Sequence, residues 1–255
     1  MHLEFKGKTV IVSGAAHGFG RAIALAFAQR GASVWVCDVV EEELLETRRL
    51  CSAAGGTCEA RVADVRDAQL VNAFVAEASA ATGRIDVLVN NAGGVLGQVG
   101  RPLEDVSPSQ WQAIFDVNVS GAFFLSQAVA PAMKAAKSGR IINISSGAGL
   151  GISLTGIQAY ASAKAAQIGL TRQLAHELGP WQITVNNVAP GFVRSNPTTE
   201  KQWESYGEAR QRTLIENIAL KRLGSVDDIV AGVLFFASDA ASWITGQVLS
   251  IDGGK

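Results

Sequence analysis

Tyr160 and Lys164 are the residues of this chain whose types and spacing point most directly to chemistry. Positions four apart on a helix share one face, so the phenol and the ammonium can converge on a single site. A free tyrosine has a pKa of about 10, and a neighbouring ammonium favours the phenolate and lowers that pKa. The pair could therefore exchange a proton with a substrate oxygen. An isolated Tyr-x-x-x-Lys is more often a half-buried tyrosine beside a surface lysine, so the residues around it decide.

A glycine-rich turn follows the first apolar run of the sequence and leads directly into an alanine-rich helical stretch. Glycines there let the backbone approach a pyrophosphate, and the helix N-terminus supplies free N–H groups and partial positive charge. Such turns also close ordinary strand–helix junctions. Because this one opens the first strand–turn–helix unit, it favours a dinucleotide site. The residues concerned are Ser13, Gly14, His17, Gly18, Phe19 and Gly20.

Asp38 lies at the end of the second predicted strand, eighteen residues after Gly20. A carboxylate at this place can accept hydrogen bonds from the adenosine ribose hydroxyls and would repel a 2′-phosphate. No arginine or lysine lies in residues 37–40. We therefore expect NAD rather than NADP. Two observations keep the question open: a lone aspartate can simply cap a helix, and His17 could contact a phosphate.

Short β-branched runs alternate with longer helical stretches, which predicts an α/β fold: a single doubly wound parallel sheet (Rossmann fold) of about seven strands with helices on both faces. Several runs are apolar at nearly every position, as in strands buried on both faces. One helix is predicted to begin with Ser107 as N-cap and to run towards Met133. We expect one domain, residues 1–255. The predicted strands are Thr9–Ser13, Ser33–Cys37, Thr57–Val62, Val87–Asn90, Arg140–Ser145, Thr184–Val188 and Val248–Ile251.

Composition narrows the function classes. A net charge of −1 argues against a nucleic-acid or acidic-lipid partner. The sequence contains no run of about 20 apolar residues, so no membrane-spanning helix is expected. The first residues are charged and do not resemble a signal peptide. Three cysteines without metal spacing are expected to be reduced thiols of a cytoplasmic protein. The three histidines lie far apart, so no metal site is expected.

Taken together, these residues resemble the short-chain dehydrogenase/reductase family along essentially the whole chain. Any one of these matches could arise by chance, but the occurrence of all of them in the family's order along the chain is specific to the family. Besides the glycine turn, the matching residues are Asp64-Val65, Asn90-Asn91-Ala92-Gly93, Asn118, Ser145-Ser146, Tyr160 with Lys164, Pro190-Gly191 and Asp252-Gly253-Gly254.

The resemblance implies roles for individual residues. Ser146 would polarise the substrate oxygen, and Tyr160 would be the acid–base. Lys164 would also bind the nicotinamide ribose, and Asn118 would hold a water linking Lys164 to solvent. Alternatively, Asn118 would only bend the helix, with its side chain hydrogen-bonded to the backbone. Further cofactor contacts are implied for Asp64, Val65, Asn91, Val193 and Ser195. Family members are often homotetramers (or dimers) joined through the helices that carry Asn118 and Tyr160.

The chain departs from the family pattern at three places. Ser13 replaces the usual threonine of the glycine turn and keeps its hydroxyl. The family's serine usually lies thirteen residues before the tyrosine, where this chain has Gly147. Anchoring on Ser-x-x-Gly selects Ser146 instead, with Ser145 as the alternative. After Pro190-Gly191, Ser195 takes the place of a threonine near the nicotinamide amide.

Residues 195–220 interrupt the strand–helix rhythm and form the predicted substrate-binding loop or lid. Arg194, Trp203, Tyr206, Arg210 and Arg212 lie in or beside it, which suits a sugar, polyol or hydroxy acid. The same charges could simply be a solvated helix face. We therefore expect an NAD-dependent dehydrogenase of a small polar secondary alcohol or ketone. Two alternatives remain: a 3-oxoacyl-thioester reductase, and a non-catalytic NAD-binding scaffold or redox sensor.

Overall fold

The computed structural model describes residues 3–153 and 155–255. Seven strands, all parallel, form one sheet in the order β3-β2-β1-β4-β5-β6-β7. The predicted α/β fold is confirmed, and each predicted strand is present with ends that move by at most two residues. The strands are β1 (Thr9–Ser13), β2 (Ser33–Asp38), β3 (Thr57–Val62), β4 (Val87–Asn90), β5 (Gly139–Ile144), β6 (Ile183–Pro190) and β7 (Val248–Ile251).

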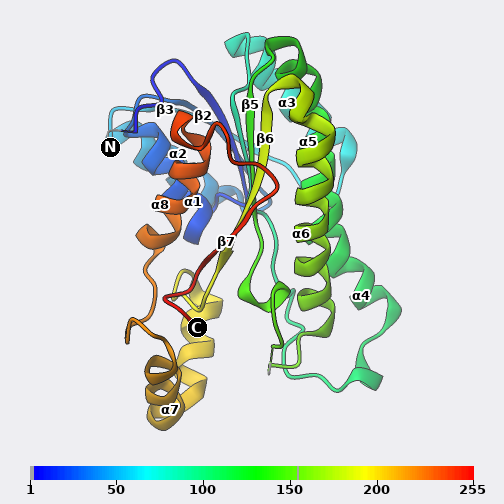
Figure 1. Cartoon of the computed structure of the whole chain (residues 1–255), viewed down its shortest axis with the longest axis vertical. Coiled ribbons are helices and arrows are strands. Elements are labelled where there is room, and N and C mark those ends of the chain that lie inside the picture. The colour runs from blue at the N-terminus through cyan, green and yellow to red at the C-terminus, as the bar shows by residue number, and fades with distance from the viewer. Residues whose placement is uncertain (1–2, 154) are drawn as a thin grey trace.

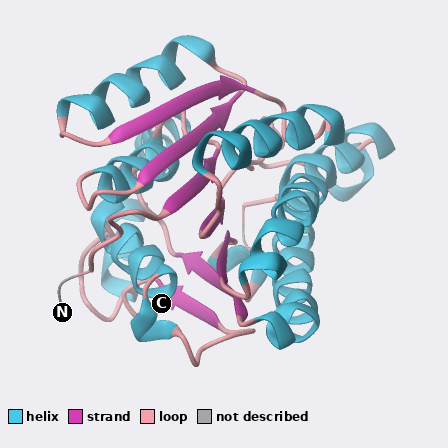
Figure 2. Cartoon of the chain, turned by 90° about the horizontal axis from the view of Figure 1, so that it is seen from above, coloured by secondary structure: helices cyan, strands magenta, loops and turns pink. Residues whose placement is uncertain are grey.

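Helices cover both faces of the sheet (Figures 1 and 2). Helices α1, α2 and α8 pack on one face, and α3, α5 and α6 on the other, with α4 against α6. The helices are α1 (Gly18–Ala28), α2 (Glu41–Ala53), α3 (Ala68–Thr82), α4 (Pro108–Phe115), α5 (Gly121–Ala136), α6 (Gln158–Leu178), α7 (Pro197–Asn217) and α8 (Val226–Ala237).

Alternate residues of each central strand supply two separate cores, because successive side chains point to opposite faces. Val10 and Val12 of β1 pack with Phe27 of α1 on one face. Ile11 of the same strand packs with Val129 and Met133 of α5 on the other. All six side chains are fully buried, and burial of each contributes about 1.5–3 kcal/mol. This two-sided burial explains why the strands read as continuous apolar runs.

The strand order reverses between β1 and β4, whose carboxyl ends open at the same edge of the sheet. In open α/β sheets, ligands bind at such a switch point. The ends of β1, β2, β4, β5 and β6 bring the glycine turn, Asp38, Asn91, Ser146 and Pro190 to this edge.

The predicted helix from Ser107 towards Met133 is present, but a π-helical turn at Asp116–Ser120 interrupts it. Ser107 is the N-cap of α4, as expected from the sequence, and the structure adds a capping box with Gln110. By length and composition alone, Pro108–Ala136 could cross a membrane. In this fold the stretch packs against the sheet and α3, with Leu125, Val129 and Met133 buried.

Residues 195–220 are mainly helical rather than a loop. A capping box at Asn196 starts α7, and Pro197 occupies the first helical position. The helix is kinked at Gly207, whose φ of 67° lies in the left-handed region that favours glycine. Helix α7 projects beyond the carboxyl edge of the sheet (Figure 1). The stretch breaks the strand–helix rhythm because this helix covers no part of the sheet.

Candidate active site

Lys164 lies on α6 and is 3% exposed. Its Nζ donates to the main-chain oxygen of Ile144 at 2.8 Å and to Oε1 of Gln167 at 3.2 Å. The same Nζ lies 5.6 Å from the ring centroid of Tyr160. Burial lowers the pKa of Lys164 to about 7. Phenol and ammonium therefore share one buried site, as the four-residue spacing predicts.

The phenol of Tyr160 differs from our expectation. Burial raises the pKa of Tyr160 above its usual value, and a hydrogen bond with Ser146 acts in the opposite direction. We expected the ammonium of Lys164, together with bound oxidised nicotinamide, to lower this pKa. In the protein alone burial is the larger cause, and the ammonium of Lys164 is not among the causes of the shift. The protein alone therefore favours the protonated phenol.

Two adjacent serines, Ser145 and Ser146, directly follow β5, and they have different partners. Ser145 is buried, and its hydroxyl donates to the side chain of Asn187 and to the main-chain oxygen of Val188. Ser146 is the serine that interacts with the phenol of Tyr160, and its Oγ also accepts from the N–H of Ala148 at 3.1 Å. The geometry favours Ser146 over Ser145 as the residue that meets a substrate oxygen.

Asn118 lies in the π-helical turn and is fully buried. Its Nδ2 donates to the main-chain oxygens of Gly94 and Ile114, both at 2.9 Å, and its Oδ1 accepts from the N–H of Gly94 at 3.0 Å. The side chain thus ties the loop after β4 to the helix. These contacts agree with the alternative in which the backbone satisfies the side chain of Asn118. A water bound here would have to hydrogen-bond to a main-chain group or to the remaining lone pair of Oδ1.

The glycine turn is fitted tightly to the end of β4. A Cβ on Gly14 would lie 2.6 Å from Cα of Ala92, and one on Gly20 would lie 2.1 Å from the oxygen of Gly14. Asn91 donates to the main-chain oxygens of Ser13 and Gly14, and the hydroxyl of Ser13 accepts the N–H groups of Asn91 and Ala92. The polar atoms of Ser13 and Asn91 therefore shape the turn.

The N-terminus of α1 fits a pyrophosphate. His17 is the N-cap residue and is exposed, and its side chain makes no capping hydrogen bond. The N–H groups of the first turn, from Gly18 onward, have no capping side chain to satisfy them, and a phosphate oxygen could take that place. This observation carries the case for a dinucleotide in this structure.

Asp38 is fixed beside that turn. Its Oδ2 accepts from the N–H of Ala16 at 2.9 Å, and its Oδ1 accepts from Val39 at 2.7 Å and Val40 at 3.2 Å. The guanidinium of Arg21 also reaches the turn, but it pairs with Glu43. Three main-chain N–H groups thus hold the carboxylate of Asp38 beside the glycine turn.

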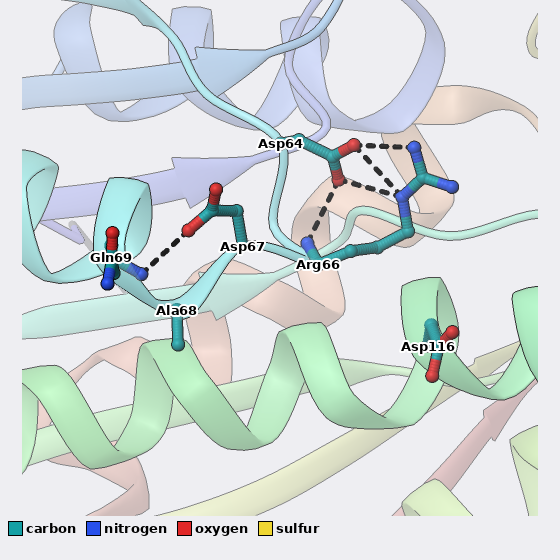
Figure 3. Close-up of a pocket in the computed structure, with 6 residues that line it drawn as sticks. All are labelled: Asp64, Arg66, Asp67, Ala68, Gln69 and Asp116. Carbon is teal, nitrogen blue, oxygen red and sulfur yellow. Dashed lines mark hydrogen bonds and ion pairs between the residues drawn. The ribbon is translucent and has the colours of Figure 1, made fainter.

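Asp64 and Val65 follow β3, as predicted. The guanidinium of Arg66 donates to both carboxylate oxygens of Asp64, which lowers the pKa of Asp64 (Figure 3). Val65 is buried against Gly121. Asp64 and Arg66 line an open hollow of about 580 Å³. Asp116 lies across it, while Tyr160 and Lys164 are not among its lining residues (Figure 3).

The segment after β6 runs past the glycine turn. Val193 is buried and forms an isolated parallel β-bridge with Gly224. A Cβ on Gly18 would lie 3.0 Å from the main-chain oxygen of Ser195, so Ser195 borders the turn directly. Its N–H donates to Thr199 at 2.9 Å, which leaves the hydroxyl of Ser195 weakly engaged by Asn196 at 3.4 Å.

Aromatic rings join α7 to the segment after β6. Phe192 lies 5.9 Å from both Trp203 and Tyr206, centroid to centroid. Arg194 pairs with Glu200 at 2.8 Å and lies 5.9 Å from the Trp203 ring, so its charge is already matched. Arg210 lies 4.1 Å from the Tyr206 ring, and none of the described carboxylates pairs with it.

The structure therefore brings Ser146, Tyr160 and Lys164 together, with Asn118 one contact away through the Gly93–Gly94 loop. Asp64, Trp203 and Arg210 lie outside this cluster. Two residues were missed: Gln167, which contacts Lys164, and Phe192, which contacts Trp203 and Tyr206. Gln167 could have been found because it lies one helical turn after Lys164. Phe192 could have been found because an aromatic residue directly follows Pro190-Gly191.

A family model described as enoyl-(acyl carrier protein) reductase matches residues 14–255. The chain belongs to the short-chain dehydrogenase/reductase family. Among similar proteins is a (2S)-[(R)-hydroxy(phenyl)methyl]succinyl-CoA dehydrogenase subunit of Thauera aromatica, 39% identical over 99% of this chain and 98% of the relative. A 3-oxoacyl-[acyl-carrier-protein] reductase of Thermotoga maritima is 37% identical over 99% of each chain.

Solved structures of the family agree with the fold. An NAD⁺-bound xylitol dehydrogenase superposes with a TM-score of 0.91 at 30% identity, covering 98% of this chain and 99% of that one. A gluconate 5-dehydrogenase of Beutenbergia cavernae, described as putative and holding NADP, gives a TM-score of 0.89 at 37% identity, covering 98% and 97%. Members of this oxidoreductase family thus bind either nucleotide.

Proposed function

We propose that this protein is an NAD-dependent dehydrogenase that oxidises a small polar secondary alcohol, or reduces the corresponding ketone. The proposal is carried by the cluster of Ser146, Tyr160 and Lys164 at the carboxyl edge of the sheet. A turn that fits a dinucleotide lies at the same edge.

Each residue has a defined task in alcohol oxidation. Bound nicotinamide would supply the acceptor for the hydride that leaves the alcohol carbon. Tyr160, as phenolate, takes the proton of the alcohol hydroxyl, and Ser146 donates a hydrogen bond to the same oxygen. The ammonium of Lys164 stabilises the phenolate. In ketone reduction Tyr160 returns the proton. Because burial raises the pKa of Tyr160, positive charge nearby is needed to form the base.

Asp38 supports NAD over NADP. Three main-chain N–H groups hold its carboxylate at the end of β2, where ribose hydroxyls would donate to it and a 2′-phosphate would be repelled. The side chains that follow, Val39 and Val40, are exposed and apolar and offer no cation to such a phosphate.

The segment around α7 supports a substrate with hydroxyl or carboxylate groups. Arg210 supplies donors that no described carboxylate occupies, and Trp203 and Tyr206 present aromatic surface. Relatives named for xylitol and gluconate are of this class.

A 3-oxoacyl-thioester reductase is the second candidate. Two relatives are named for acyl thioesters. Leu150 and Ile152, in the segment between Ser146 and Tyr160, are exposed apolar side chains, Ile152 at 92%. Apolar surface there would suit an acyl chain better than a sugar.

Binding and turnover measured together test the proposal. Nicotinamide fluorescence gives the affinities for NADH and NADPH, and a panel of sugars, polyols, hydroxy acids and 3-oxoacyl thioesters is then assayed with both cofactors. We expect tighter NADH binding and turnover of a polar alcohol. Thioester reduction with NADPH would favour the second candidate. Tight NADH binding with no turnover of any compound would contradict an enzyme and favour a scaffold or redox sensor.

A further inference from the structure

Gln167 is a fully buried polar residue one turn after Lys164 on α6. Its Oε1 accepts a hydrogen bond from Nζ of Lys164 at 3.2 Å. Its Nε2 has no hydrogen-bond partner among the described residues. An amide with an unsatisfied donor is costly to bury, whereas an apolar side chain of similar size could fill the same space. Packing alone therefore does not explain why an amide occupies this position. The interaction that the amide does make, through its oxygen, is with Lys164.

The main-chain oxygen of Gln167 belongs to a buried polar network that continues away from the site. Thr171 donates to that oxygen at 2.9 Å and accepts from Nδ2 of Asn143 at 2.8 Å. Asn143 in turn accepts from Asn90 at 2.8 Å. None of these three side chains hydrogen-bonds Lys164, since its two acceptors are Gln167 and the main chain of Ile144. Gln167 is thus the only described side chain that accepts from this ammonium.

The ammonium has three N–H donors. Ile144 and Gln167 accept two of them on the inner side, at 2.8 and 3.2 Å. The third remains available to the side where Tyr160 lies, with the ring centroid 5.6 Å away. A buried lysine with one acceptor fewer would be held less firmly, and its charged form would be less favoured.

We propose that Gln167 is a positioning residue for Lys164: its amide oxygen, together with the main chain of Ile144, fixes the ammonium inward so that one N–H stays directed towards Tyr160 and bound ligand. The role in catalysis rests on the proposed dehydrogenase function, whereas the effect on Lys164 itself does not.

The charged surroundings of Lys164 are simple. Tyr160 is the titratable side chain beside it on α6. The neighbours from β5, from the turn after it, from the loop after β4 and from the π-helical turn are uncharged: Ile144, Gly149, Gly93 and Asn118. Burial lowers the pKa of Lys164, and none of these neighbours carries a charge that would shift it further. A change in that pKa on substitution of Gln167 would therefore report the loss of the hydrogen bond that its amide accepts from Lys164.

The test compares Gln167→Met, which keeps the bulk and removes the acceptor, with Thr171→Val, which breaks the polar network without touching Lys164. Lysine side chains are labelled with ¹³C at Cε and titrated by NMR, and Lys164→Met assigns the signal. We expect Gln167→Met to lower the pKa of Lys164 by about one unit, the size that loss of one hydrogen bond to a charged group produces, and Thr171→Val to leave it unchanged.

Where a substrate is found, the acidic limb of the pH profile of kcat/KM for alcohol oxidation should move to higher pH in Gln167→Met, because a less charged Lys164 stabilises phenolate less. Thr171→Val should lose stability without this movement. An unchanged Lys164 titration in Gln167→Met, or an equal change in both variants, would overturn the proposal. Because the titration needs no turnover, it remains decisive if the dehydrogenase proposal fails.

Discussion

At the scale of single residues, Lys164 combines deep burial with a charge that the proposed chemistry needs. Burial lowers its pKa to about 7, against an ordinary value of 10.5. The folded protein thus releases this proton at lower pH than the unfolded chain does. Between these two pKa values the unfolded state binds more protons, so this group makes unfolding less favourable as pH rises.

Lys164→Met should therefore remove a pH dependence of stability. From pH 7 to pH 9, the free energy of unfolding of the wild type should rise relative to that of the variant, by up to about 1.4 kcal/mol per pH unit. Urea denaturation of both proteins at several pH values measures the difference. A constant difference across this range would show that Lys164 titrates normally and is not buried as described.

Asp38 allows a residue-scale test of nucleotide choice. Asp38→Ala removes an acceptor for the ribose hydroxyls and the charge that repels a 2′-phosphate. Hydrogen bonds to a charged group contribute about 1.5–3 kcal/mol, so NADH affinity should fall roughly tenfold or more. NADPH affinity should fall less or rise. Nicotinamide fluorescence titrations measure both, and equal losses would remove Asp38 from ribose recognition.

At the scale of elements, the turn between β1 and α1 leaves no room for a side chain at Gly20. A Cβ there would lie 2.1 Å from the oxygen of Gly14 and 2.7 Å from Nδ2 of Asn91. Gly20→Ala should therefore displace the turn, lower the melting temperature and weaken NADH binding at least tenfold. Gly179→Ala is the matched control, because nothing lies within 4 Å of its Cβ position. Similar behaviour of the two variants would contradict the fitted turn.

The elements also show what the sequence could predict. Period and composition located every strand, because strands buried on both faces are apolar throughout. The N-cap at Ser107 could be predicted from residue types alone. The π-helical turn at Asp116–Ser120 was not, because it depends on Asn118 bonding to the backbone of Gly94, a contact between segments distant in sequence.

Within the site, local spacing predicted the contact of Tyr160 with Lys164. It could not predict the direction of the Tyr160 pKa, which depends on how deeply the ring is buried. Arg194 was expected to meet substrate, but the fold pairs it with Glu200 six residues later. The sequence shows that a residue is charged, but whether that charge is free to bind a substrate depends on the ion-pair partners that the fold places beside it.

At the scale of the whole molecule, we propose that the protein is a homotetramer joined through α4, α5 and α6. Trp111 and Phe123 on α4 and α5 are 39% and 41% exposed. Gly169 on α6 is exposed, and a Cβ there meets nothing within 4 Å in the chain itself. Such a surface of apolar and small residues would suit close packing of a second copy.

Gly169→Arg tests this assembly, because a single chain has room for the new side chain and a packed partner does not. Sedimentation velocity should give the mass of four chains for the wild type and a smaller species for Gly169→Arg, with far-UV circular dichroism unchanged. Gly179→Arg, at an equally open position at the end of α6, should remain tetrameric. A monomeric wild type, or a Gly169→Arg protein that stays tetrameric, would contradict the proposed interface.

Tyr160→Phe tests the central claim most directly, because it removes one oxygen atom and keeps the ring. With the substrate found by the screen, turnover should fall by about 10²–10⁴-fold or more, the usual contribution of a general acid–base group, while NADH affinity stays within about twofold. Turnover close to that of the wild type would contradict the acid–base role of Tyr160 and with it the proposed mechanism.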